Sequence, residues 1–200
     1  MIRLATIFSG IGSIEWALKR MNLDYKIVFA CDNGDIELKD IDEEEVRKKM
    51  FSLKTIEEQK QYEDELYSKV KKTNFVKSTY FANYDIDEKD FHYDVRFLDG
   101  RKYKNKVDLF VGGSPCQAFS IMGYQKGFED TRGTLFYEYA RLVKEIQPKV
   151  FIFENVQGLL KHDGGKTWEV IKNVFNNLGY NFSFRVLDSK DFGIPQLEED

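Results

Sequence analysis

Short apolar runs alternate along the chain with longer segments whose apolar residues recur at helical spacing. Four runs have the length of a buried strand, and they cover residues 4–8, 27–31, 107–111 and 150–153. Three segments with apolar residues three or four positions apart predict helices that begin at Ser13, at Thr134 and near Trp168. Alternating strands and helices predict an α/β domain, with a mostly parallel sheet covered by helices on both faces.

Two weaker strand signals complete this pattern. Residues 93–95 predict a short third strand that carries Asp94. Residues 182–187 alternate between apolar and polar side chains, which predicts a further strand near the end of the chain. Pro148 should stop the helix that begins at Thr134, and Gly179 should end the helix near Trp168.

The segment 35–90 differs from the rest because it is rich in charge and poor in glycine. Thr55 and Glu58 have the spacing of a capping box, which predicts a helix start. We interpret the segment as a charged helical insertion that lies against one edge of the sheet or stands clear of it. The alternative is an element that binds a partner.

Length, charge and cysteine content narrow the class of protein. The 200 residues suffice for one domain, and we expect a single catalytic and cofactor-binding domain over 1–200. We expect a cytoplasmic protein without a membrane segment, because no apolar run is long enough and no signal peptide is evident. The two cysteines have no metal-type spacing, so no metal site is expected. The net charge of −4 gives no overall basic field for nucleic acid, which a local patch or another segment would have to supply.

The beginning of the chain has the order strand, glycine turn, helix, strand and acid. Backbone N–H groups between Phe8 and Ser13 would lie at a helix start, where they suit a carboxylate or phosphate. Asp32 ends the second strand and could accept hydrogen bonds from ribose hydroxyls, while Asp94 could accept one from an adenine amino group. Taken singly, these residues also fit a tight turn and a helix cap or surface carboxylate. Together they indicate a cofactor that contains adenosine.

The candidate chemistry lies at the ends of two later strands. Cys116 follows the strand at 107–111 in a loop of small and polar residues, which is a poor environment for an inert core thiol. Lys126 and Arg132 are candidates for lowering the pKa of that thiol. Glu154 ends the next strand and could act as a proton donor whose pKa is raised by burial. Cys31, by contrast, lies within an apolar strand and is assigned to packing.

Several motifs together resemble those of the DNA cytosine-5 methyltransferase family, of the bacterial restriction–modification type. The motifs are Pro115-Cys116-Gln117, Glu154-Asn155-Val156 and the segments 8–12, 127–135 and 192–196. The resemblance covers nearly all of the chain outside 35–90. It implies a Rossmann-like fold for an S-adenosylmethionine-dependent methyltransferase, with transfer of a methyl group to C5 of cytosine in double-stranded DNA.

The resemblance also implies roles for individual residues. The cofactor would be bound by Phe8, Gly10, Ile11, Gly12, Asp32, Asn33, Asp94, Val95 and Leu135. Cys116 would attack C6 of the cytosine, Glu154 would hold and protonate N3, and Asn155 would order the loop around Cys116. DNA would be contacted by Gln117, Ser120 and Arg132. The cytosine would have to be flipped out of the duplex to reach the thiol.

The last residues depart from the family pattern. Glu198 and Asp200 stand where the family has arginines at alternate positions, and the target-recognition domain is absent from these 200 residues. We therefore expect a catalytic region truncated before that domain, which needs complementing sequence, such as a second polypeptide carrying it. The alternatives are a catalytically incompetent fragment that binds a cofactor or partner, and an RNA cytosine-5 methyltransferase.

Overall fold

The computed structural model describes residues 1–114 and 135–193. The chain forms two compact units, Met1–Asn155 and Val156–Asp200. The strands are β1 (Ile2–Ile7), β2 (Tyr25–Cys31), β3 (Phe91–His92), β4 (Leu109–Gly113) and β5 (Val150–Glu154). The α-helices are α1 (Ser13–Arg20), α2 (Glu43–Ser52), α3 (Ile56–Ser68), α4 (Phe75–Asn83), α5 (Leu135–Ile146) and α6 (Lys166–Asn177).

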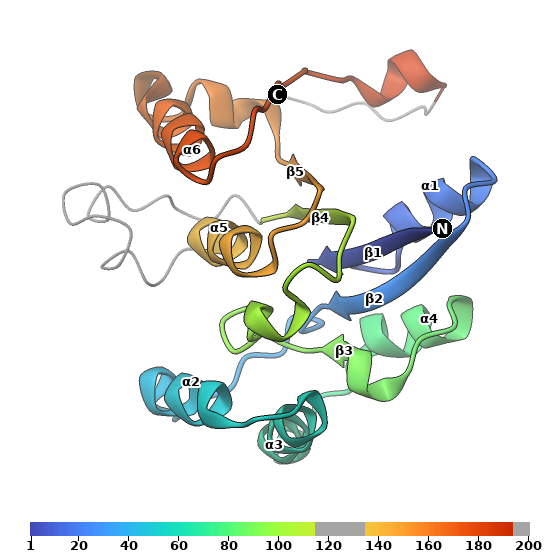
Figure 1. Ribbon diagram of the computed structural model, residues 1–200, viewed down its shortest axis with the longest axis vertical. Helices are drawn as coiled ribbons and strands as arrows, with labels where there is room; N and C mark the ends of the chain where they lie inside the picture. The colour runs from blue at the N-terminus through green and yellow to red at the C-terminus, as the bar shows by residue number, and fades with distance from the viewer. Residues whose placement is uncertain (115–134, 194–200) are drawn as a thin grey trace. The chain divides into compact units, whose positions relative to one another are not determined.

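The first unit is built on one parallel sheet, with strand order β3-β2-β1-β4-β5 (Figure 1). Each predicted strand within 4–8, 27–31, 107–111 and 150–153 is present within two residues of its expected bounds. The chain starts in the middle of the sheet at β1 and adds strands first on one side and then on the other. This reversal leaves a crevice at the carboxyl ends of β1 and β4, where open α/β sheets bind ligands. The predicted Rossmann-like α/β fold is confirmed.

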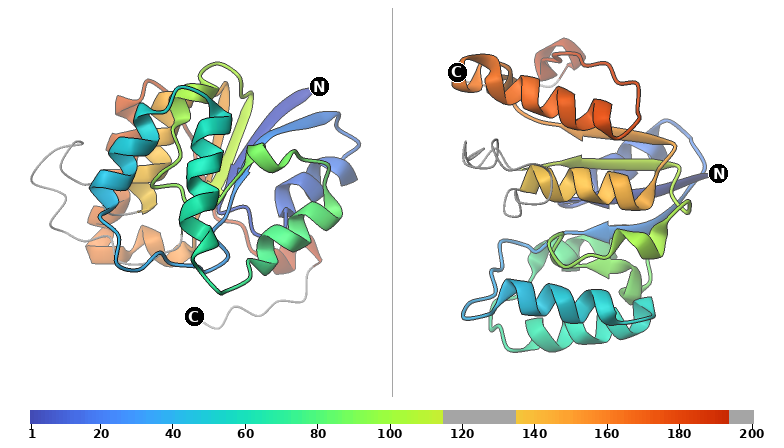
Figure 2. Two further views of the ribbon diagram at one scale, coloured as in Figure 1. Left: turned by 90° about the horizontal axis from the view of Figure 1, so that it is seen from below. Right: turned by 60° about the vertical axis from the view of Figure 1, so that its left-hand side comes forward.

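Helices cover both faces of the sheet in the first unit (Figure 2). Leu18 of α1 packs against Leu4 and Val111. On the other face, the Phe110 ring lies 5.2 Å from the Tyr139 ring of α5, measured between centroids. Because neighbouring residues of a strand point to opposite faces, Phe110 and Val111 show that α1 and α5 cover opposite sides.

The charged segment 35–90 folds into α2, α3 and α4. The predicted capping box is confirmed, because Thr55 and Glu58 each satisfy a backbone N–H of the other residue at the start of α3. Val46 and Met50 of α2 pack against the buried Phe97. Tyr80 of α4 is fully buried in a cluster with residues of β2 and β3. These helices therefore contribute to the core of the first unit, while their charged faces are exposed.

Two strand predictions differ from the structure. β3 covers Phe91–His92, not 93–95, because the Glu63 carboxylate of α3 accepts the Tyr93 N–H at 2.8 Å and ends the ladder. Asp94 instead forms a turn in which its carbonyl accepts the Phe97 N–H. Residues 182–187 form no strand, and Phe184 in that segment is exposed. Alternation alone did not produce a strand there, because a strand also needs a neighbour to pair with.

Candidate cofactor and catalytic site

A pocket of about 210 Å³ opens at the crevice between the carboxyl ends of β1 and β4. Its lining comes from β1 and the following loop, the start of α1, and the ends of β4 and β5. The lining residues are Thr6, Ile7, Phe8, Ser9, Ser13, Ile14, Val111, Gly112, Gly113 and Glu154. The pocket therefore brings together Phe8 and Glu154, which the sequence assigned to the cofactor and to catalysis.

The loop after β1 is held open by its backbone conformation and by one carboxylate. Phe8 has a φ of 52°, a left-handed conformation that is uncommon for a bulky residue and is found at functional sites. The Gly10 N–H and the Gly34 N–H each donate to the Asp32 carboxylate at 2.8 Å, one to each oxygen. Asp32 thus joins the loop after β1 to the loop after β2. Each oxygen keeps a further lone pair for a hydroxyl group.

The first turn of α1 provides donors for an anionic group. No side chain caps the helix start, and Ser13 and Ile14 line the pocket. The first N–H groups of a helix lack partners within the helix and carry partial positive charge. This arrangement suits a carboxylate, such as the one on the amino-acid portion of S-adenosylmethionine. The residues present therefore fit the expected cofactor.

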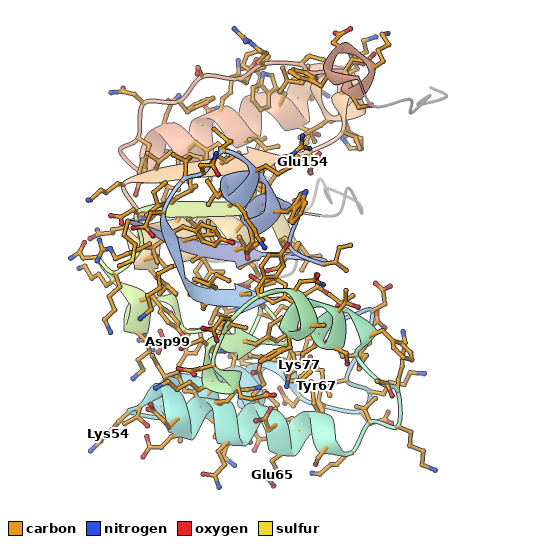
Figure 3. All side chains as sticks on the ribbon, turned by 90° about the vertical axis from the view of Figure 1, so that its right-hand side faces the viewer. Lys54, Glu65, Tyr67, Lys77, Asp99 and Glu154 are labelled. Atoms are coloured by element: carbon orange, nitrogen blue, oxygen red, sulfur yellow. The ribbon has the colours of Figure 1, made fainter. Side chains whose placement is uncertain are left out.

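Glu154 approaches the end of β4 closely. The parallel register pairs it with Gly113 (Figure 3 labels Glu154). A Cβ atom at position 113 would lie 2.3 Å from Glu154 Oε2, so glycine at this position lets the carboxylate lie against the end of β4. Glu154 is exposed and not buried, which differs from the expectation of a proton donor tuned by burial. Its position at the pocket nevertheless leaves the carboxyl group open to a ligand.

Asn155 links the ends of the same two strands. Its side-chain Nδ2 donates to the Ser114 carbonyl at 2.9 Å, one residue before the Pro-Cys-Gln motif begins. Five predicted residues lie outside the described residues, and they are Cys116, Gln117, Ser120, Lys126 and Arg132. Glu198 and Asp200 lie outside them as well.

The other predicted cofactor residues are not among the residues that line the pocket. Asp94 is buried, and its carboxylate accepts from the Arg96 guanidinium at 2.6 Å. Val95 is buried next to it, and Leu135 begins α5 half-buried. Asn33 accepts the Asp35 N–H in the loop after β2. Gly10, Ile11 and Gly12 lie between the lining residues Ser9 and Ser13, and Ile11 is exposed over 62% of its surface.

Sequence reasoning missed a buried polar network beneath the pocket. Glu15 of α1 is fully buried, and its Oε1 accepts from Thr6 Oγ1 at 2.9 Å and from the Tyr80 hydroxyl at 2.6 Å. Ser9 Oγ lies 2.8 Å from Thr6 Oγ1. The only local signal was the spacing of Glu15, three positions before the buried Leu18 and on the same face of α1. A contact between Tyr80 and Glu15 has no signature in a single sequence.

The backbone of Cys31 is hydrogen-bonded to the pocket-lining Ser9, but Cys31 itself does not line the pocket. Cys31 is fully buried in β2, and burial raises the pKa of its thiol, which confirms its assignment to packing.

Within 1–114 and 135–193, no group of three or more His, Cys, Asp or Glu residues could hold a metal ion. Over the same ranges, no helix has the length and apolar character needed to cross a membrane.

Comparisons with known proteins identify relatives over the whole chain. The pattern of the family described as C-5 cytosine-specific DNA methylase matches residues 51–199. Orphan methyltransferase M.SPRI of Bacillus phage SPR is 36% identical over 198 residues, which are 99% of this chain and 36% of that protein. Type II methyltransferase M.HhaI of Haemophilus parahaemolyticus is 55% identical over 92 residues, which are 46% of this chain and 28% of that protein.

A solved structure supports the fold. The S. pombe Dnmt2 methyltransferase matches with a TM-score of 0.52 at 18% identity, over 90% of this chain and 41% of that chain. This chain spans 36% and 28% of the two curated relatives named above. The family pattern covers most of the sequence, including the Glu154-Asn155 motif that borders the pocket. The chain therefore belongs to the C-5 cytosine-specific DNA methylase family.

Proposed function

We propose that this chain is the catalytic and cofactor-binding part of an S-adenosylmethionine-dependent DNA cytosine-5 methyltransferase. The observation that carries the proposal is the convergence of the ends of β1, β4 and β5 on one pocket. There the Glu154 carboxylate lies beside Gly113, and Asn155 holds the backbone that leads into the Cys116 loop. The family membership supports the choice of cytosine as the methylated base.

The proposed reaction uses two residues of this chain on one cytosine ring. The Cys116 thiolate forms a bond to C6 while Glu154 donates a proton to N3, so that C5 becomes electron-rich. When bound, S-adenosylmethionine would supply an electrophilic methyl group: C5 would bond to the methyl carbon as the bond from that carbon to the sulfonium sulfur breaks, and the sulfur would keep the electron pair. The C5 proton then leaves to solvent, the electron pair of its bond restores the C5–C6 double bond, and the C6–sulfur bond breaks. N3 returns its proton to Glu154 in the same stage.

Asn155 has a positioning role in this proposal. Its side chain donates to the Ser114 carbonyl at 2.9 Å, so it fixes the backbone next to Pro115. A nucleophile reacts efficiently only when the attacking atom is held near its target. Removal of the Asn155 amide should therefore slow formation of the covalent bond more than it weakens cofactor binding.

The cofactor assignment extends from the pocket to the loop after β2. The α1 N-terminus would hold the carboxylate of the amino-acid portion, and Asp32 would accept from the ribose hydroxyls. The adenine would lie near Asn33, Asp94 and Val95, with Leu135 closing the pocket. The Asp94 carboxylate already accepts from Arg96, so an adenine amino group would share this acceptor.

The DNA assignment depends on residues in the loop that follows β4. Gln117, Ser120 and Arg132 would contact the duplex around an extruded cytosine, with Arg132 on phosphate. A segment or second polypeptide with a target-recognition domain would select the sequence. The chain spans 36% of M.SPRI, and we propose double-stranded DNA as its partner.

A covalent-trapping experiment tests the proposal. The chain, together with a polypeptide that carries a target-recognition domain, is incubated with labelled S-adenosylmethionine and duplex DNA containing 5-fluorocytosine. We expect an adduct that survives denaturation, because fluorine at C5 cannot leave as the proton does. Cys116→Ala should abolish the adduct, and Glu154→Gln should slow its formation. An adduct that persists in Cys116→Ala would overturn the assignment of the nucleophile.

The substrate is tested by parallel arms with duplex DNA and tRNA. Methylation of DNA alone is the expected result. Methylation of tRNA alone would overturn the DNA assignment and favour the RNA enzyme. Calorimetric binding of S-adenosylmethionine without turnover on either substrate would overturn the catalytic proposal and leave a cofactor-binding module.

A further inference from the structure

The charged helical insertion contacts both loops of the proposed cofactor site through one helix, α4. The Tyr84 hydroxyl, at the end of α4, donates to the Gly12 carbonyl at 2.6 Å. The Tyr80 hydroxyl donates to Glu15 Oε1 at 2.6 Å. At the other end, Asn74 Nδ2 donates to the Asp32 carbonyl at 3.1 Å. One helix of the insertion thus holds the loop after β1 and the loop after β2.

The contact between Tyr84 and Gly12 leaves no free space. Gly12 has a φ of 86°, and a Cβ atom added there would lie 2.1 Å from Cε2 of the Tyr84 ring. The ring therefore covers the residue that precedes α1, while the hydroxyl fixes its carbonyl. Since Gly12 is the N-cap of α1, Tyr84 sets where the first free N–H groups of that helix point.

Tyr80 contacts the same loop indirectly, because its hydroxyl belongs to the buried hydrogen-bond network of Glu15, Thr6 and Ser9. Its hydroxyl and Thr6 Oγ1 are the two donors to Glu15 Oε1, and Thr6 and Ser9 line the pocket. Glu15 Oε2 is buried and has no hydrogen-bond partner among the described residues. Burial and the Glu15 carboxylate raise the pKa of Tyr80, so its hydroxyl stays a donor. Loss of this donor would leave a buried carboxylate with Thr6 alone.

We propose that Tyr80 and Tyr84 are positioning residues for S-adenosylmethionine, and that α4 is part of the cofactor site although neither side chain lines the pocket. This inference rests on the proposed function, because it names what orders the loop that would bind the cofactor. Both tyrosines act on the cofactor loop and not on the Glu154 side of the pocket. Their loss should therefore affect cofactor affinity and leave the chemical step largely unchanged.

The test compares Tyr84→Phe and Tyr80→Phe with Tyr62→Phe as a matched control. Each change removes one hydroxyl and keeps the ring, and Tyr62 lies in α3 with its ring against Lys49. Calorimetry should show a dissociation constant for S-adenosylmethionine raised about three- to tenfold in the first two variants, the effect of one hydrogen bond. In turnover assays of the complemented protein, KM for the cofactor should rise and kcat should stay within about twofold.

A second measurement separates this inference from the proposed function. Hydrogen exchange of the Gly10, Gly12 and Ser13 amides is followed in the protein without cofactor, where Tyr84→Phe should speed exchange and Tyr62→Phe should not. If Tyr84→Phe speeds exchange of the loop amides but the protein never binds S-adenosylmethionine, the proposed function is wrong, while the ordering of the loop by Tyr84 is supported. Unchanged exchange and affinity in Tyr84→Phe and Tyr80→Phe would overturn the positioning role, even if the melting temperature fell.

Discussion

At the scale of single residues, the site contains two glycines that each lie in close contact with a side chain from another element. A Cβ at Gly113 would have to displace the Glu154 carboxylate, because Glu154 Oε2 occupies the space that it would need. Gly12 is restricted in the same way by the ring of Tyr84. The carboxylate lines the pocket and the tyrosine does not, but each approaches the backbone closely at a glycine.

Gly12→Ala should destabilise the first unit by about 1–3 kcal/mol, the usual cost of a strained left-handed residue. The added Cβ also has to displace the Tyr84 ring, which would break the hydrogen bond to the Gly12 carbonyl. Urea unfolding measures the change. Gly10→Ala is the matched control, because Gly10 lies in the same loop with a positive φ of 53° and nothing lies within 4 Å of its added Cβ. Equal stability of Gly12→Ala and the wild type would contradict the close contact with Tyr84.

At the scale of elements, the sheet is joined across β1 and β4 by one ion-pair cluster. Arg3 donates to the Asp108 carboxylate from its side chain at 3.0 Å and from its backbone N–H at 2.9 Å. Lys149, just before β5, lies 2.9 Å from Asp108 Oδ1. The carboxylate therefore links the starts of three neighbouring strands at the edge of the sheet opposite the pocket.

Asp108→Asn should destabilise the protein at neutral pH and have a smaller effect in acid. The Arg3 side chain, then Lys149 and the Arg3 backbone N–H, hold the pKa of Asp108 well below its ordinary value of 3.8. A carboxyl group whose pKa is lowered by folding stabilises the folded state above its unfolded pKa, and this contribution is lost as pH falls through the folded pKa. The unfolding midpoints of the two proteins should therefore begin to converge below about pH 4 and approach each other further as the pH falls toward the folded pKa.

Asp24→Asn is the control for this pH dependence, since the Asp24 side chain is 78% exposed and lies 3.7 Å from the N-terminal amine. It should change the unfolding midpoint little at any pH. A difference between Asp108→Asn and the wild type that stays constant down to pH 3 would show that Asp108 acts by packing and not by charge.

Element prediction succeeded where burial alone determines the pattern. The four apolar runs became β1, β2, β4 and β5; β1, β2 and β4 are largely buried, as strands inside a parallel sheet are, while β5 leaves Val150 and Ile152 about half exposed. It failed at 93–95, where a side chain from α3 takes the backbone donor that a strand would use. The prediction from the sequence that Asp32 and Glu154 lie at the ends of strands is confirmed. It could not reveal Tyr80, which meets Glu15 across 65 positions of chain.

At the scale of the whole molecule, the insertion is part of the fold as well as of the proposed site. Its helices bury Val46 and Met50 against Phe97, and Tyr80 against residues of β2 and β3. Glu63 of α3 also satisfies the N–H that follows β3. Most charged residues of 35–90 lie on the exposed faces of these helices, which is why composition suggested a surface element, but Lys60 and Glu63 of α3 are buried.

Replacement of residues 43–83 by a short Gly/Ser linker should therefore abolish cooperative unfolding of the first unit. The deletion uncovers Phe91 and Phe97 and leaves the buried Glu15 carboxylate without the Tyr80 donor. Thermal unfolding followed by near-UV circular dichroism is the measurement. The control is Lys48→Ala on the exposed face of α2, which should change stability by no more than about 0.5 kcal/mol. A deleted chain that still unfolds cooperatively and binds S-adenosylmethionine would show that the insertion is separable from both fold and site.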